Sequence, residues 1–250
     1  MEQKNKRAFS YEENDEIAYG KLPEAPWTFC PGRTGATLVY QLIGGNGRSN
    51  QTHDLMYSEN NFKKRGHKLI VNYRDIRDMI VSRWRTEVLS TEGRHEWYYS
   101  SKMNVHDVDI VREQKGFIHD LKHLSEIVFN WDTDTYIPLR YEVWNKDYNH
   151  IFDVAKKECE GYIGKHTGVL VGFDVPEGRR KELIAKYSRD NNYTVQAFFT
   201  NFTEWDEDRM IHGHHINKET TDWREKMDED AKIYCNRKFG KLIKAMGYKL

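Results

Sequence analysis

The sequence predicts an α/β protein in which a central parallel β-sheet is flanked by helices. The first observation is that short apolar runs rich in β-forming residues alternate with segments of helical periodicity, a pattern typical of parallel strands joined by helices. The second is the length of 250 residues without an internal repeat, low-complexity segment or linker, which suits a single large core. We therefore expect one domain over residues 1–250, with the polar and charged residues 1–24 as a loose N-terminal arm.

Three segments have the composition of strands. They are residues 27–30, 68–73 and 136–141. The second has a β-rich apolar centre and is bounded by polar residues, as strands commonly are. Pro138 indicates an irregular or early position in the third strand, because proline cannot donate a hydrogen bond to a neighbouring strand.

Helical periodicity marks the segments between and after these strands. We expect helices over residues 36–43, from residue 75 onward, and over 105–130, 147–161, 177–188 and 224–246. The helix that begins at residue 75 carries apolar side chains at four-residue spacing, namely Ile76, Ile80, Trp84 and Val88. The segment 105–130 is expected to be one long helix, with an apolar face made of Ile110, Phe117, Leu121, Leu124 and Val128.

Composition excludes several classes of function. The chain has 39 Lys and Arg and 39 Asp and Glu, so its formal charge of zero gives no reason to expect nucleic acid as a partner. We find no apolar run long enough to span a bilayer and no secretory signal near residue 1, so we expect a cytoplasmic protein without a membrane partner. The three widely spaced cysteines, Cys30, Cys159 and Cys235, are expected to be free thiols.

A turn joins the first predicted strand to the first predicted helix. Residues 31–37 read Pro-Gly-Arg-Thr-Gly-Ala-Thr. Such a turn directs successive backbone N–H groups at one point, and the helix N-terminus adds positive potential, so an anion can bind there. Arg33 supplies a positive charge, and Thr34 and Thr37 supply hydroxyl donors. The turn is not a Walker A loop, since Ala36 follows its last glycine; the alternative is a plain connection between strand and helix.

A second candidate anion site follows the second predicted strand. Arg74 stands at the carboxyl end of that strand, where α/β proteins bind ligands. Ser82 follows about two helical turns later, on roughly the same side of the helix, so the two residues can share an anion. The alternative is an amphipathic helix whose Arg and Asp residues pair on its solvent face.

Together the two elements resemble the sulfotransferases that use 3′-phosphoadenosine 5′-phosphosulfate (PAPS). Residues 33–37, Arg-Thr-Gly-Ala-Thr, are similar to that family's 5′-phosphosulfate loop, Lys/Arg-Ser-Gly-Thr-Thr. Residues 72–82 are similar to its 3′-phosphate element, with Ile76 where the family has Pro. The resemblance implies a three-layer sandwich like that of P-loop nucleotide kinases, PAPS as the sulfuryl donor, and no metal.

The resemblance also implies roles for individual residues. Residues 51–53, Gln-Thr-His, resemble the family's Lys-Thr-His, so His53 is the implied catalytic base. Arg33 is the implied stabiliser of charge on the bridging oxygen and the leaving phosphate. The further implied contacts to PAPS are Thr34, Gly35, Ala36, Thr37, Arg74, Ser82, Tyr141, Ser188, His214, His215 and Trp223.

Two departures from the family pattern accompany the resemblance. Gln51 stands where many members have Lys, and the C-terminal Arg-Lys-Gly triplet is absent, which leaves Arg209, His214 and His215 as candidates to close over the 3′-phosphate. The histidine-rich run 212–215 matches no established zinc pattern.

The expected activity is sulfuryl transfer from PAPS to a hydroxyl group of a small molecule, with release of adenosine 3′,5′-bisphosphate. Carboxylates near aromatic residues, among them Asp132, Asp134, Glu204 and Asp206, favour a cationic alcohol as acceptor. The alternatives are a P-loop-type nucleotide or small-molecule kinase, which would use ATP and magnesium, and a non-catalytic PAPS-binding homologue. The pattern leaves open oxygen or nitrogen as the acceptor atom and a monomer or homodimer as the assembly.

Overall fold

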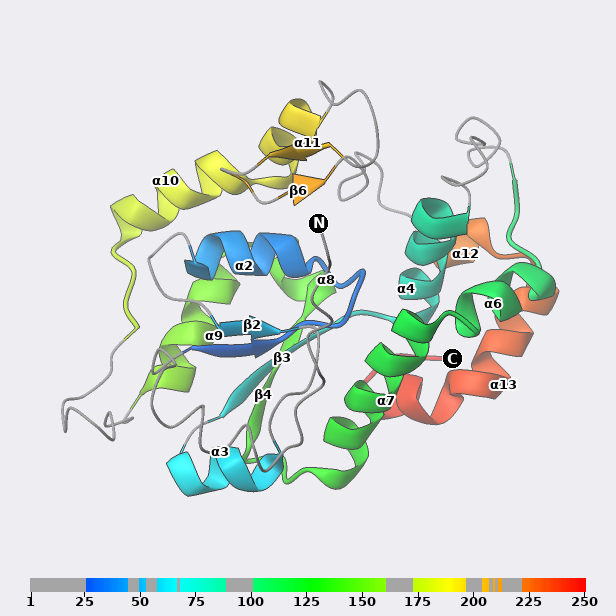
Figure 1. Ribbon diagram of the computed structural model, residues 1–250, viewed down its shortest axis with the longest axis horizontal. Helices are drawn as coiled ribbons and strands as arrows, with labels where there is room; N and C mark the ends of the chain where they lie inside the picture. Colours follow the sequence, from blue (N-terminus) through cyan, green and yellow to red (C-terminus); the bar gives the residue numbers. More distant parts are fainter. Residues whose placement is uncertain are drawn as a thin grey trace, which may run out of the picture.

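The centre of the molecule is a four-stranded parallel sheet with the strand order β2-β1-β3-β4 (Figure 1). The computed structural model describes residues 26–44, 50–52, 58–66, 68–88, 101–160, 173–196, 204–206, 209, 211–212 and 222–250. The strands are β1 (Trp27–Phe29), β2 (Asn50–Thr52), β3 (Leu69–Tyr73) and β4 (Tyr136–Arg140). The predicted α/β fold with a parallel sheet is confirmed.

Helices cover both faces of this sheet. Phe29 and Val71 belong to a core shared with α3 (Glu59–Arg65) and α7 (Lys115–Asn130). Ile70 and Leu139 belong to a second core, shared with α2 (Ala36–Gly44) and α9 (Asn149–Cys159). Successive side chains of a strand point to opposite faces, so neighbouring residues such as Ile70 and Val71 enter different cores. Parallel sheets are commonly buried on both faces in this way.

The order of the strands reverses between β1 and β3. From β1 the chain passes through α2 to β2 on one side, whereas β3 pairs with the other side of β1 and leads outward to β4. Ligands of open α/β sheets bind outside the carboxyl ends of the strands at such a reversal. The two segments that leave the sheet there are residues 30–35, after β1, and Arg74 and Asp75, after β3.

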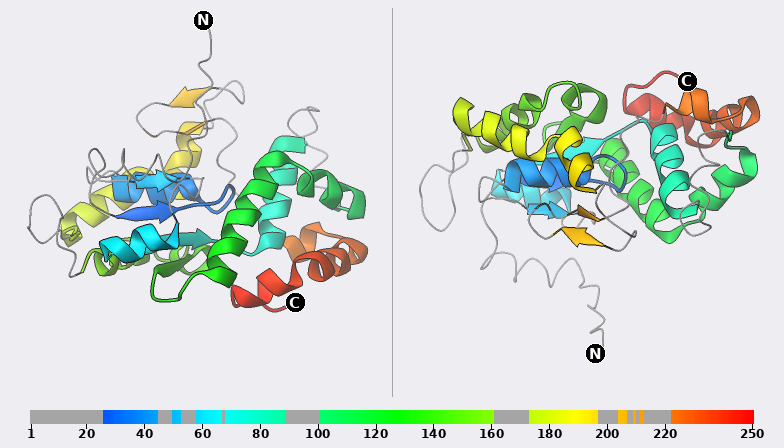
Figure 2. Two further views of the ribbon diagram at one scale, coloured as in Figure 1. Left: turned by 60° about the horizontal axis from the view of Figure 1, so that its bottom comes forward. Right: turned by 90° about the horizontal axis from the view of Figure 1, so that it is seen from above.

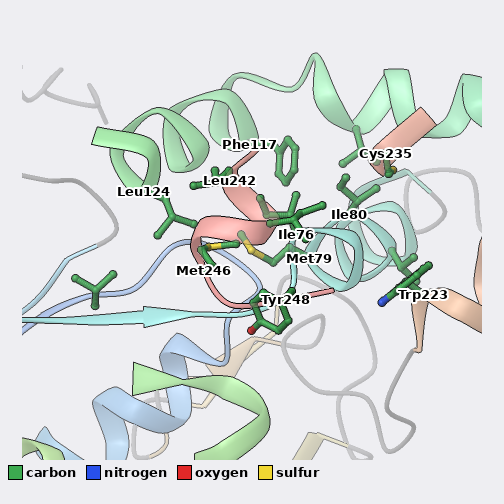
Figure 3. Close-up of a cluster of buried hydrophobic side chains, with 14 of the residues drawn as sticks. Ile76, Met79, Ile80, Phe117, Leu124, Trp223, Cys235, Leu242, Met246 and Tyr248 are labelled. Atoms are coloured by element: carbon green, nitrogen blue, oxygen red, sulfur yellow. The ribbon is translucent and has the colours of Figure 1, made fainter. Parts of the chain in front are cut away.

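A group of helices packs beside the carboxyl end of the sheet (Figures 1 and 2). It contains α4 (Ile76–Arg83), α6 (Val105–Arg112), α12 (Trp223–Lys226) and α13 (Glu229–Ala245), and the π-helical turn η1 (Trp84–Val88) continues α4. Figure 3 shows the core of this group, where Leu242 and Met246 from the C-terminal region meet Ile76 and Met79 of α4 and Phe117 of α7. Helix α4 therefore carries the residues after β3 on a buried support.

The remaining described elements lie over α2, on the side away from the sheet (Figure 1). They are α10 (Glu177–Tyr187), α11 (Arg189–Gln196) and a hairpin of β5 (Trp205–Asp206) and β6 (Ile211–His212). The short helix α8 (Tyr141–Trp144) does not belong to this group and directly follows β4. Two buried amides connect α2 to α11, since Asn192 Nδ2 donates to Gln41 Oε1 at 2.8 Å. Among the helices in the described ranges, none has the length and apolar content required to cross a bilayer.

The segment 105–130 is two helices rather than the single helix that was predicted. Helix α6 ends at Arg112, and Gln114 has an extended backbone (φ −66°, ψ 129°) before α7 begins. Val111 and Phe117 are both buried, yet in an uninterrupted helix they would lie about 120° apart around the axis. The break turns both side chains into one core and leaves Ile110, expected on the apolar face, 38% exposed.

The C-terminal segment 224–246 is also divided, contrary to the prediction of one helix. Met227 is extended and forms a parallel bridge with Met103, and Asp228 then caps α13 by accepting a hydrogen bond from Ala231 N. The bridge pairs two segments that are far apart in the sequence, so helical periodicity carries no sign of it. Tyr141, expected as the last strand residue, instead begins α8. The elements α3, α11, β2, β5 and β6 were not predicted, and the expected arm 1–24 lies outside the described residues.

Candidate functional site

The loop between β1 and α2 has a constrained backbone. Arg33 has a positive φ of 70°, which no other non-glycine residue in the described ranges shows, and Gly35 has a φ of 79°. A Cβ atom at Gly35 would lie 2.6 Å from Trp144 Cη2, so a side chain is excluded there. Residues held in the left-handed region cluster at ligand-binding sites, where the surrounding structure must hold them in place. The backbone of this loop is therefore fixed by its surroundings, a feature that it shares with many binding loops.

A chain of buried hydrogen bonds from β3 and α8 fixes Thr34. Its hydroxyl donates to Pro31 O at 2.6 Å, and Asn72 Nδ2 donates to both Thr34 O and Thr34 Oγ1 at 3.0 Å. Trp144 Nε1 in turn donates to Asn72 Oδ1 at 3.0 Å. Because the Thr34 hydroxyl proton is used within the loop, we expect the backbone N–H of Thr34, rather than its side chain, to serve an anion.

Asn72 and Trp144 were not assigned roles from the sequence. Asn72 has no exposed surface and lies in β3, between apolar neighbours. Buried polar groups are retained where they are hydrogen-bonded, and here the amide joins the loop to α8. A polar residue inside an otherwise apolar strand was the available signal, although the sequence does not show which partner it meets.

The structure brings the two predicted anion elements together. Arg33 Nε donates to Ser82 Oγ at 3.2 Å, across 49 residues of sequence. The Arg74 guanidinium lies over the Tyr141 ring, with Cζ 4.5 Å from the ring centroid. The same ring covers Gly35, since Tyr141 Cε2 would be 3.1 Å from a Cβ placed there. Arg33, Gly35, Arg74, Ser82 and Tyr141 thus form one group at the point where the strand order reverses.

Arg74 forms a long ion pair with Asp78. Arg74 Nε is 3.9 Å from Asp78 Oδ2, one helical turn further along α4. Burial raises the pKa of Asp78 to about 6, although Arg74 and the N–H of Trp223 favour its ionised form. Trp223 N donates to Asp78 Oδ1 at 2.9 Å, so Trp223 joins the group through its backbone. Asp78 was not assigned a role from the sequence; its spacing of four residues from Arg74 was the signal.

The second arginine of the same segment is sealed inside the protein. Arg77 is 1% exposed and binds both oxygens of Asp75, at 2.9 Å from Nε and 2.6 Å from Nη2. Its guanidinium also donates to Asn236 Oδ1 and Lys249 O and lies 3.8 Å from the centroid of the Trp223 ring. Arg and Asp of this segment do pair, but in the core rather than on a solvent face.

The helix N-terminus after the loop contributes Ala36 and Thr37. They are the first two residues of α2, and the N–H groups of Leu38 and Val39 turn back to Gly35 O. The first N–H groups of a helix have no partner within it, so those of Ala36 and Thr37 can serve an anion held by the loop.

Other predicted site residues lie elsewhere or outside the described residues. Ser188 separates α10 from α11 and accepts a hydrogen bond from Asn191 N at 3.4 Å, as a helix cap does. The Arg209 guanidinium donates to Lys186 O and to Asn192 Oδ1, and thus contacts the α10–α11 region. His53, His214 and His215 lie outside the described residues. The strand before His53 ends at Thr52, which pairs with Phe29, the last residue of β1.

The acidic residues expected to favour a cationic acceptor are dispersed. Asp132 and Asp134 precede β4 and therefore lie at the amino edge of the sheet, opposite the loop, where Asp132 is 3.7 Å from Lys63. Asp206 accepts a hydrogen bond from Arg209 N within the β5–β6 hairpin. Asp132 and Asp134 therefore cannot line an acceptor pocket beside Arg33.

Comparison with known proteins does not extend this description. No family model matches the chain, and a search of curated proteins finds no match. Within the part of the chain that the structure describes, no group of three or more His, Cys, Asp and Glu residues is arranged to hold a metal ion. The functional assignment therefore depends on the residues gathered around the loop.

Proposed function

We propose that this protein is a sulfotransferase that moves a sulfuryl group from PAPS to a hydroxyl group of a small molecule. One observation carries the proposal: Arg33 of the β1–α2 loop contacts Ser82 of α4, while Arg74 and the loop glycine share the Tyr141 ring. Two cationic side chains, a helix N-terminus and a serine hydroxyl thereby meet in one place. That set suits a ligand with two separate phosphate groups, such as an adenosine 3′,5′-bisphosphate.

The fold supports the same proposal. A loop between the first strand and its helix, at the reversal of strand order, is where phosphate groups bind in many α/β proteins. We infer that the sheet and its two helical layers form a three-layer sandwich of the P-loop nucleotide-kinase type. The residue after Gly35 is Ala36, so the loop lacks the lysine that nucleotide kinases use at this point.

In this mechanism each residue has one task. Arg33 and the loop N–H groups hold the 5′-phosphate and stabilise the charge that develops as its bond to sulfur breaks. Arg74 and Ser82 hold the 3′-phosphate. The Tyr141 ring, over which the Arg74 guanidinium lies, is the proposed aromatic contact to PAPS. His53 accepts the proton of the acceptor hydroxyl while the acceptor oxygen bonds to sulfur, because a neutral imidazole is a suitable base near pH 7. PAPS supplies the activated sulfuryl group.

Calorimetry with the purified protein tests the binding part of the proposal. We expect adenosine 3′,5′-bisphosphate to bind at least about tenfold more tightly than ADP with magnesium, since only the former has a phosphate for Arg74 and Ser82. Tighter binding of ADP with magnesium would instead indicate a kinase. Binding of neither would contradict the proposal.

Turnover tests the chemical part. A mass-spectrometric assay with PAPS and a panel of cationic and neutral alcohols should detect a sulfated product. We expect His53→Ala to abolish turnover and to leave the affinity for adenosine 3′,5′-bisphosphate unchanged. His106→Ala, which removes an exposed imidazole on α6, is the matched control and should retain activity. Tight binding of the bisphosphate without turnover of any alcohol would indicate the non-catalytic homologue.

A further inference from the structure

The loop is held from a second direction by a helix far away in the sequence. Gly32 N donates to Asp120 Oδ2 of α7 at 3.0 Å, across 88 residues. The same oxygen accepts from Arg83 Nη1 at 3.2 Å. Asp120 is 6% exposed and Arg83 lies at the end of α4, one residue after Ser82. Asp120 thus joins the loop, α4 and α7 at one carboxylate oxygen.

Asp120 occupies a position where packing alone would favour an apolar side chain. Helix α7 turns Phe117, Leu124 and Ile127 into the core, and Asp120 is buried on the same helix. A buried carboxylate is unfavourable unless it is both hydrogen-bonded and paired with a positive charge. Asp120 meets both conditions by binding Gly32 and Arg83, so its contacts indicate what the carboxylate does.

Two glycines allow this close approach. A Cβ at Gly32 would lie 3.0 Å from Asp120 Oδ2, and one at Gly116 would lie 2.6 Å from Arg83 Nη2. Side chains at either position would push the carboxylate or the guanidinium away from the loop. Glycine at positions 32 and 116 is therefore what lets Asp120 and Arg83 approach the loop.

The two anchors of the loop lie on either side of Arg33. Asp120 holds Gly32, and Asn72 holds Thr34. Arg33 lies between them with its positive φ and its side chain on Ser82. A non-glycine residue remains in the left-handed region only where its surroundings oppose relaxation. Fixing both neighbours of Arg33 provides that opposition and determines where its N–H and guanidinium point.

We infer that Asp120 is a positioning residue for the 5′-phosphate loop: it holds Gly32 so that Arg33 and the following N–H groups point at the bound 5′-phosphate. This inference rests on the proposed function. Gly32 belongs to the 5′-phosphate loop, so we expect the loss of Asp120 to weaken binding of the 5′-phosphate more than binding of the 3′-phosphate at Arg74 and Ser82.

Calorimetry with two ligands separates this role from a general effect on folding. For Asp120→Ala we expect the affinity for adenosine 3′,5′-bisphosphate to fall at least about tenfold, toward that for adenosine 3′-monophosphate. The affinity for adenosine 3′-monophosphate should stay unchanged. Asp120→Asn keeps an oxygen acceptor for Gly32 N–H and should restore most of the bisphosphate affinity. The control is Asp153→Ala, which removes a carboxylate of α9 that pairs with Arg180 of α10, and it should behave as wild type.

A double variant distinguishes position from charge. Removing Asp120 alone leaves Arg83 without this carboxylate, and the extra positive charge would by itself strengthen anion binding. The variant Arg83→Ala/Asp120→Ala keeps the net charge constant, and we expect it to lose bisphosphate affinity selectively. If Asp120→Ala does not fold, as judged by circular dichroism, Asp120→Asn and Arg83→Ala carry the test, with smaller losses confined to the bisphosphate.

The other outcomes overturn the inference. Equal losses for both ligands would mean a structural role only, and a gain in bisphosphate affinity in the double variant would mean that Asp120 does not position the loop. Unchanged affinities in every variant would also contradict it. Failure of the wild-type protein to bind the bisphosphate would refute the proposed function itself, and with it the role of Asp120, whereas wild-type binding with unaltered variants would refute Asp120 alone.

Discussion

Two arginine–aspartate pairs, Arg77–Asp75 and Arg74–Asp78, lie within five residues at the start of α4 and have opposite characters. The first is closed, with two short contacts at 2.9 and 2.6 Å and with Asn236 and Lys249 completing the guanidinium shell. The second is open, with its nearest atoms 3.9 Å apart.

The difference is in keeping with a structural role for Arg77 and with the proposed 3′-phosphate role for Arg74. A buried charge that is held by several short contacts holds the fold together, and removing its partner is costly. A cation that faces a weakly held carboxylate can exchange that contact for a phosphate. Each pair consists of one arginine and one aspartate from the same short segment, so only the geometry of their contacts distinguishes them.

The largest expected effect is on stability, at the closed pair. Arg77→Ala leaves Asp75 buried without its main cation and removes the contacts to the C-terminal region. We expect the free energy of unfolding to fall by about 3–5 kcal/mol. Urea denaturation followed by circular dichroism measures it. A loss below about 1 kcal/mol would mean that the pair is not the support described here.

The next effect concerns pH at the open pair. Burial raises the pKa of Asp78 from 3.8 to about 6 in the folded protein. The folded state then binds this proton more tightly than the unfolded state, so the contribution of Asp78 to stability is lost as pH rises from about 4 to about 6. The shift corresponds to at most about 3 kcal/mol.

Asp78→Asn isolates this contribution, since its amide oxygen can still accept from Trp223 N. The difference in unfolding free energy between variant and wild type should favour the variant increasingly from pH 4 to pH 7. Denaturation at a series of pH values measures that difference. A difference independent of pH would show that Asp78 titrates normally.

The third effect is on binding at the open pair. Arg74→Ala should weaken the binding of adenosine 3′,5′-bisphosphate by about 2 kcal/mol, a factor of about 30 in affinity, because a charge-assisted contact to the 3′-phosphate is lost. We expect a smaller loss of stability than for Arg77→Ala, since the contact from Arg74 to Asp78 is the longer of the two ion pairs. Calorimetry and urea denaturation measure the two quantities. Arg179→Ala, which removes an exposed arginine of α10, is the control. A stability loss as large as that of Arg77→Ala would abolish the distinction between the pairs.

The smallest effect is at the edge of the closed pair. Tyr248 OH donates to Glu142 Oε2 at 2.6 Å, and Glu142 Oε1 accepts from Asp75 N. Burial and the nearby Glu142 raise the pKa of Tyr248, so the phenol stays protonated. We expect Tyr248→Phe to cost about 1 kcal/mol in unfolding free energy, measured by urea denaturation, without altering bisphosphate affinity. A selective loss of binding would place Tyr248 in the site instead.

Local patterns predicted the parts of the fold that depend on nearby residues. Strands β1, β3 and β4 and helices α2, α9 and α10 lie within a few residues of their expected bounds, because apolar runs and helical periodicity act over short stretches. The break before Lys115 and the bridge between Met103 and Met227 were missed, since each depends on packing against a distant segment.

The candidate site shows the same division. Arg33, Arg74 and Ser82 could be selected from their spacing after predicted strands. Asn72 and Asp120, which hold the loop residues on either side of Arg33, carry no local signature beyond being polar residues in apolar surroundings. Contacts across 38 and 88 residues of sequence cannot be inferred from either residue's neighbours.

The sequence by itself indicated strands β1, β3 and β4, helices α2, α9 and α10, the turn after the first strand and the cations near the strand ends. Only the tertiary structure decided that Arg77 is enclosed by Asn236 and Lys249 while Arg74 faces Tyr141. The physical reason is that helix and strand formation depends on local backbone preference and periodicity. The burial and the partners of a charge depend instead on segments that folding brings together from distant parts of the chain.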